Sequence, residues 1–180
     1  MTLRIALLRG VNVGGNKKVA MADLKAMVEA LGFTGVKTLL QSGNVVFEAD
    51  GQSDSQLEAL LEGEAEKQLG LVSKFIVRDT RAWRAIIDAN PMPDEAEREP
   101  SRFLVNVSRE TVTADQLAAI RAVATPGEKV DAVDRCVYVF FGDGIADSKA
   151  ALVFGKKSLG LTVTGRNWNT VRKIAALIGA

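Results

Sequence analysis

The chain has no histidine, the side chain that most often acts as a general base near neutral pH or as a nitrogen ligand for metals. A Ser-His-Asp or Cys-His arrangement is therefore excluded within one chain. The single cysteine, Cys136, lies in the apolar stretch CVYVFF. A disulfide framework and a cysteine zinc site within the chain are excluded as well. We interpret Cys136 as a small core residue, and the sequence identifies no metal site and no cofactor.

Long apolar runs and an excess of one charge are also missing. No stretch approaches the roughly 18 apolar residues of a membrane span, and the opening MTLRIALLRG is too short for the apolar region of a signal peptide. We therefore expect a soluble, cytoplasmic protein with no membrane partner. The 23 basic and 22 acidic residues give a net charge of +1, whereas proteins that wrap duplex nucleic acid carry a marked basic excess. Nucleic acid is a disfavoured partner, although a local patch could still bind it.

The first half of the chain alternates strand and helix patterns. With 47% apolar residues, the chain can bury a proper core. Leu24, Met27, Val28 and Leu31 have the spacing of one helix face, and Ser53-x-x-Gln56 is a capping box that begins another helix. Strands are expected at 3–8, 36–41, 45–48 and 72–78, and helices at 21–31, 53–69 and 79–90. The order up to residue 78 is β-α-β-β-α-β, as in ferredoxin-like folds.

The second half repeats this order. Strands are expected at 103–107, 129–133, 136–141 and 161–164, and helices from Thr113, at 148–159 and from Asn167. Between the halves, residues 91–101 (PMPDEAEREPS) hold three of the four prolines and are typical of a linker. We predict an α+β fold with a first ferredoxin-like subdomain over 1–90, a linker over 91–101, and a second over 102–180 that includes a C-terminal helix. Each antiparallel sheet should carry two helices on one face. The open faces could pack together or edge strands could be exchanged, and the sequence does not decide which.

One stretch between the first strand and the first helix is rich in glycine, asparagine and lysine: RGVNVGGNKK, residues 9–18. Backbone amides freed by its glycines could form a nest for phosphate or carboxylate, its basic side chains could add charge, and a helix N-terminus lies just beyond. The spacing is neither that of a Walker A loop nor that of a Rossmann GxGxxG motif. The alternative is a purely structural connection whose glycines adopt positive φ.

A second polar segment, RNWNT at residues 166–170, opens the last helix. Asn167 is a natural N-cap, while Arg166 and Asn169 could meet the glycine-rich stretch if this end folds back onto the opening strand. The alternative is a capped helix start with a surface arginine. The candidate ligand-binding residues from the two segments are Arg9, Asn12, Gly14, Gly15, Asn16, Lys17, Lys18, Arg166, Asn167 and Asn169.

The motif Gln41-Ser42-Gly43-Asn44 separates two expected strands. Ser42 has no histidine to activate it, so nucleophilic chemistry would need a lysine base such as Lys17 or Lys18. We interpret the motif as a tight hairpin turn in which Asn44 takes the left-handed conformation.

Several motifs together resemble one known family. RGVNVGGN, the helix end VEALGF, the hairpin QSGNVVF and the closing GRNWNTVRKIAAL are similar, in this order, to a bacterial family of uncharacterised proteins named domain of unknown function, number sixteen ninety-seven. The resemblance implies two ferredoxin-like subdomains with exchanged terminal strands. It supplies no established activity, substrate or catalytic residue. One departure is Ala20, where the family often has a proline before the first helix.

The functional hypothesis is binding of a small anionic or phosphorylated ligand at the glycine-rich stretch. The alternative is a nucleic-acid-binding or protein-interaction module without catalysis. Only 6% of the residues are aromatic, and no strand carries the aromatic pattern of RNA-recognition motifs. The sequence leaves open whether the protein is an enzyme, which ligand it binds and how it assembles.

Overall fold

The computed structural model describes residues 1–15 and 17–180 and separates into two compact units. The first comprises Met1–Arg84 together with Leu177–Ala180, and the second comprises Ala85–Ala176. Each unit contains one four-stranded antiparallel sheet. The predicted α+β class is confirmed, and no helix among the described residues is long and apolar enough to cross a membrane.

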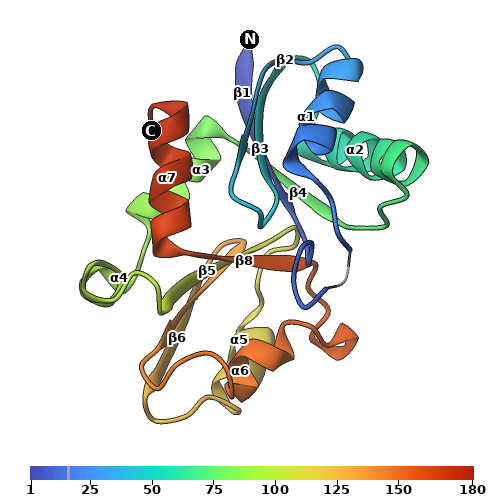
Figure 1. Cartoon of the computed structure of the whole chain (residues 1–180). Coiled ribbons are helices and arrows are strands. Elements are labelled where there is room, and N and C mark those ends of the chain that lie inside the picture. Colours follow the sequence, from blue (N-terminus) through green and yellow to red (C-terminus); the bar gives the residue numbers. More distant parts are fainter. Residues whose placement is uncertain (16) are drawn as a thin grey trace. The chain divides into compact units, whose positions relative to one another are not determined.

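The first unit has the predicted β-α-β-β-α-β order, with strands arranged β2-β3-β1-β4 in the sheet (Figure 1). Its elements are β1 (Thr2–Leu8), α1 (Met21–Ala30), β2 (Thr34–Leu39), β3 (Asn44–Ala49), α2 (Asp54–Leu69) and β4 (Phe75–Asp79). A further helix, α3 (Thr80–Asp88), follows β4 directly. The predicted Ser53–Gln56 capping box begins α2, and Gly70 ends the helix in the left-handed conformation.

The second unit repeats the arrangement, with sheet order β6-β7-β5-β8. Its elements are α4 (Pro93–Arg98), β5 (Phe103–Ser108), α5 (Ala114–Arg121), β6 (Glu128–Val133), β7 (Cys136–Phe141), α6 (Lys149–Val153), the 3-10 helix η1 (Lys157–Leu159), β8 (Val163–Asn167) and α7 (Trp168–Ile178). Each sheet uses four strands that are consecutive in the chain. The expected exchange of terminal strands is therefore not found in the part of the chain that the structure describes.

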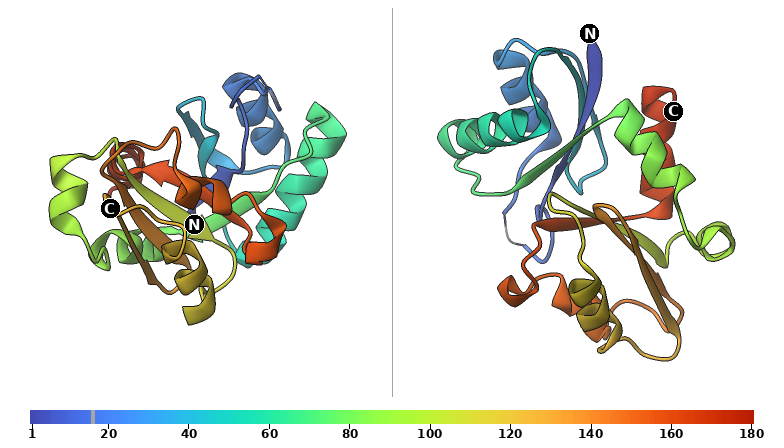
Figure 2. Two further views of the ribbon diagram at one scale, coloured as in Figure 1. Left: turned by 90° about the horizontal axis from the view of Figure 1, so that it is seen from below. Right: turned by 180° about the vertical axis from the view of Figure 1, so that it is seen from behind.

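The core of the first unit lies between its sheet and the helices α1 and α2, which cover the same face (Figure 2). Strand β1 occupies a central position, and its residues from Ile5 to Leu8 are fully buried. Because Ala6 and Leu8 point into the helix-covered core while Ile5 and Leu7 point to the other face, β1 must be apolar on both sides. This explains the nearly continuous apolar run at the start of the sequence.

The second unit differs from the sequence predictions in three places. The segment interpreted as a linker contains α4, whose Ala96 is fully buried. The single helix expected at 148–159 is instead α6 followed by η1, because the chain leaves helical geometry at Gly155 and Lys156 before Leu159 enters the core. The last strand lies two to three residues later than predicted, which places Arg166 inside β8.

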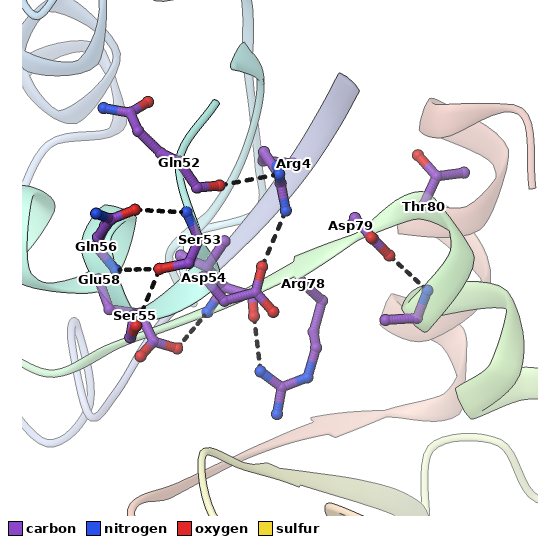
Figure 3. Close-up of polar contacts among 12 residues, drawn as sticks. Arg4, Gln52, Ser53, Asp54, Ser55, Gln56, Glu58, Arg78, Asp79 and Thr80 are labelled. Carbon is purple, nitrogen blue, oxygen red and sulfur yellow. Dashed lines mark hydrogen bonds and ion pairs between the residues drawn. The ribbon is translucent and has the colours of Figure 1, made fainter. Parts of the chain in front are cut away.

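Two glutamates of α2 cover the open edge of β4. The carboxylate of Glu58 accepts a hydrogen bond from the backbone N–H of Val77 at 2.9 Å, and Glu62 accepts one from Phe75 at 3.0 Å. The two glutamates are four residues apart and therefore share one face of the helix. Figure 3 shows Glu58 reaching from α2 towards β4. Since an open edge presents unpaired N–H groups to other strands, these carboxylates protect the sheet from unwanted pairing.

We expect Glu58→Ala to lower the free energy of unfolding by about 1–3 kcal/mol, because the N–H of the buried Val77 loses its acceptor. Glu58→Gln should lose less, since its amide oxygen can still accept the bond. Urea unfolding measures the difference, and amide hydrogen exchange at Val77 reports the site directly. Glu66→Ala, on the exposed surface of the same helix, is the control. Equal stability of Glu58→Ala and this control would contradict the assignment.

Candidate functional site at the glycine-rich loop

The loop between β1 and α1 is built from left-handed backbone. Positive φ angles occur at Gly10 (64°), Asn12 (53°), Gly14 (59°), Gly15 (80°) and Lys17 (47°). A Cβ atom added to any of these glycines would meet nothing within 4 Å. Glycine is therefore required in the loop for its backbone conformation and not for space.

The side chain of Asn12 fastens this loop at both ends. Its amide nitrogen donates to the carbonyl of Val19 at 3.0 Å and to the carbonyl of Gln41 at 2.8 Å. Its amide oxygen accepts from the N–H of Val19 at 3.0 Å. These bonds close the loop on itself and tie it to the turn between β2 and β3. Asn12, a candidate ligand residue in the sequence, thus has an evident structural role.

The β2–β3 turn packs tightly against the same loop at Gly43. A Cβ there would lie 2.7 Å from Cγ2 of Val11 and 2.8 Å from Cβ of Leu8. The prediction that Asn44 takes the left-handed conformation is wrong. Leu40 and Gly43 do so, while Asn44 is a buried residue of β3 whose amide donates to the carbonyl of Leu39 and to the Ser42 hydroxyl. This network supports the structural interpretation of the turn.

A hollow of about 450 Å³ opens beside the loop. It is lined by Asn12, Gly15, Lys18, Val19, Ala20 and Gln41. Ala20 is also the N-cap of α1, and no side chain of the described residues caps this helix end. Because the first N–H groups of a helix lack intrahelical partners, this end offers donors and a positive partial charge close to the hollow.

A second hollow, of about 260 Å³, lies on another side of the loop. Its lining includes Lys17 but not Lys18. The two neighbouring lysines therefore border different hollows, and we do not expect them to act together on one ligand.

The remaining loop candidates lie away from the larger hollow or outside the described residues. Arg9 continues the sheet: its N–H donates to the carbonyl of Lys74 at 2.9 Å, and its own carbonyl accepts from the Ser73 hydroxyl at 2.7 Å. Arg9 lines neither hollow. Gly14 lies at the exposed loop tip. Asn16 falls outside the described residues.

The candidates from the second segment belong to the second unit. Arg166 is 6% exposed, so it is not the surface arginine of the alternative interpretation, and burial lowers its pKa to about 10. Its guanidinium donates to the Thr164 hydroxyl at 3.0 Å and to the carbonyl of Gly165 at 2.8 Å. Asn167 caps α7 as predicted, because its side-chain oxygen accepts from the N–H of Thr170 at 3.0 Å. Asn169 is exposed. The meeting of this segment with the glycine-rich loop stays a prediction.

The strand-to-helix step at Arg166 has a counterpart in the first unit. Arg78 pairs with Ile5 of β1 just as Arg166 pairs with Val105 of β5. In both units the residue after this arginine caps the next helix. Asp79 caps α3, its carboxylate accepting from the N–H of Ala82 at 2.7 Å, as Asn167 caps α7. The sequence shows no repeat here, yet both segments place an arginine in the last strand and a capping residue at the start of the next helix. This match favours a structural role for Arg166 and Asn167.

The two units differ, by contrast, in the connection after their first strands. Arg109 is the register equivalent of Arg9, since its N–H donates to the carbonyl of Thr162 at 3.0 Å. Glu110 then closes the connection, with its carboxylate accepting from the N–H of Thr162 at 2.7 Å and from the Ser108 hydroxyl at 3.0 Å. Burial raises the pKa of Glu110, but these hydrogen bonds outweigh it and hold the pKa below its usual value. The first unit has Gly10 at this position and carries the long loop instead.

Two features of the first unit were missed by reasoning from the sequence. Gln41 and Val19 border the larger hollow, and only the motif QSGN hinted at the former. Arg4 donates to the Asp54 carboxylate at 3.0 Å and to the carbonyl of Gln52 at 3.1 Å, which anchors the start of α2 to β1 (Figure 3).

No group of three or more acidic or cysteine side chains suited to a metal ion occurs within residues 1–15 and 17–180.

Gly43→Ala should lower the free energy of unfolding by about 2–4 kcal/mol, because the new methyl group overlaps Val11 and Leu8 and φ is +79°. Gly14→Ala, which meets only the conformational cost, should lose about 1–2 kcal/mol. Urea unfolding of the two variants gives the comparison. A larger loss in Gly14→Ala than in Gly43→Ala would show that the turn does not pack against the loop in this way.

Asn12→Asp keeps the oxygen that accepts from Val19 but removes both N–H donors. A carboxylate would then face the carbonyls of Val19 and Gln41. We expect a loss of about 1–3 kcal/mol in the free energy of unfolding, with faster amide exchange at Val19. Asn169→Asp, at an exposed position, is the matched control. Unchanged exchange at Val19 would count against the closing role of Asn12.

Comparison with known proteins supports the fold and gives no function. The structure of the conserved bacterial protein SP0830 from Streptococcus pneumoniae matches with a TM-score of 0.75 and 23% identity, over 98% of both chains. At this identity the likeness concerns the fold alone. No curated protein matches the chain. The family model described as "Protein of unknown function (DUF1697)" matches residues 1–138, well over half of the chain. The chain therefore belongs to the DUF1697 family of proteins of unknown function.

Proposed function

We propose that the protein binds a small anionic ligand, bearing a phosphate or a carboxylate, in the 450 Å³ hollow at the glycine-rich loop. The observation that supports this most is the joint presence in one lining of the Lys18 side chain and of Ala20, where α1 begins without a side-chain cap. Both features favour negative charge. The volume lies within the range of about 300–1,000 Å³ typical of small-molecule sites.

The lining also limits the kind of ligand. Among the residues that the structure describes, it includes no aromatic side chain, so a nucleobase would find no stacking partner there. Its apolar part comes from Val19 and Ala20, which suit a short aliphatic group. Lys18 is exposed, and an exposed charge contributes little to affinity. The proposed ligand is therefore a small acid bound weakly and in a salt-dependent manner.

The contrast between the two units supports placing the site in the first. In the second unit, the connection after the first strand is closed by the protein's own carboxylate, that of Glu110. In the first unit, Asn12 and the left-handed glycines fix the loop, and the larger hollow lies open beside it. A preformed, open backbone of this kind lets a ligand bind without ordering the loop first.

The test is isothermal titration calorimetry with inorganic phosphate, pyrophosphate and citrate at low ionic strength. We expect at least one of them to bind, and Lys18→Ala to weaken that binding about two- to five-fold, the effect of removing one exposed charge. Lys17→Ala, which borders the other hollow, is the control for net charge. The proposal fails if none of the three anions binds, or if both lysine variants lose affinity equally.

A further inference from the structure

The smaller hollow of the first unit has charged groups of both signs in its lining. Its walls come from the glycine-rich loop, from α2 and from the segment that precedes β4. The lining residues are Lys17, Glu62, Gly63, Glu66, Val72, Ser73 and Lys74. All of these lining residues lie within the first unit.

Two of these charges already neutralise each other. The Lys74 ammonium contacts one carboxylate oxygen of Glu62 at 2.9 Å, and the other oxygen accepts from the N–H of Phe75 at 3.0 Å. Lys17 and Glu66 remain. Neither side chain has a hydrogen-bond or ion-pair partner among the described residues. The hollow therefore presents one cation and one anion that are unpaired within this part of the chain and that come from different elements.

We propose that this hollow binds a small zwitterion, namely a free α-amino acid with a short aliphatic side chain. Lys17 would face the α-carboxylate and Glu66 the α-ammonium group. Val72, which is 66% exposed, offers an apolar surface to the side chain. The site is distinct from the anion site proposed above and does not depend on it.

The balance of charges disfavours ligands of a single sign. A simple anion near Lys17 would also meet the carboxylate of Glu66, and a simple cation near Glu66 would meet the ammonium of Lys17. Like charges repel while a zwitterion satisfies both groups at once. The volume of about 260 Å³ lies below the range of roughly 300–1,000 Å³ typical of drug-sized ligands, which suits a ligand of amino-acid size.

The first experiment monitors the backbone amide signals of Val72 and Ser73 by NMR during titration with L-alanine. Propionate, which lacks the amine, and ethylamine, which lacks the carboxylate, are the matched probes. We expect saturable shifts with L-alanine at millimolar concentrations and no saturation with either analogue. Saturable shifts of equal size with one of the analogues would overturn the zwitterion assignment, and so would the absence of shifts with L-alanine.

A charge reversal provides the second test. Lys17→Glu and Glu66→Lys should each weaken the binding of L-alanine about two- to five-fold, as expected for one exposed ion pair. The double variant Lys17→Glu with Glu66→Lys restores the two opposite charges and should recover most of the affinity. Lys18→Ala should bind L-alanine normally, which separates this site from the anion site. If the double variant binds no better than the single ones while remaining folded by circular dichroism, the proposal is wrong.

Discussion

The hydrogen bonds of the Asn12 side chain are the interaction on which the candidate site depends. A loop with five left-handed residues among those described has many alternative conformations, and glycine loses more conformational freedom on folding than any other residue. The Asn12 amide offsets this cost locally by joining the loop to its own end at Val19 and to the turn at Gln41. Gly43 allows that turn to approach Val11 closely. The two walls of the larger hollow are thereby fixed relative to each other.

The two units show how one scaffold can carry different connections. Strand order, ladder pairing and the arginine-plus-cap step after the fourth strand are the same in both. One difference lies in the segment after the first strand, where one unit has a glycine-rich loop and the other has a short turn closed by Glu110. Since connections tolerate change far better than the strands they join, this is where a duplicated fold can acquire a separate role.

Much of the fold could be predicted because its determinants are local. Apolar spacing predicted the buried face of α1, and the capping box at Ser53 predicted the start of α2. The helix expected from Thr113 is α5, which also begins with a capping box. The failures have tertiary causes. Helix α4 has only six residues, which is too short to show helical apolar spacing in the sequence, and no side-chain cap marks its start. A surface position for Arg166 was one of two interpretations, since arginine is usually exposed, but pairing with β5 draws it into the sheet.

For the candidate site, the sequence indicated the loop but not its geometry. Lys17 and Lys18 are adjacent in the sequence, which suggests that both belong to one positively charged binding site. In the structure the two lysines border different hollows, Lys18 the larger and Lys17 the smaller. The backbone at Lys17 is left-handed (φ 47°). Lys18 shares its surroundings with the N-terminal end of α1, whereas Lys17 shares its surroundings with the acidic face of α2. Because the neighbours of a charge decide which ligand it can favour, we propose different ligands for these two adjacent and identical side chains: an anion at Lys18 and a group that carries both signs at Lys17.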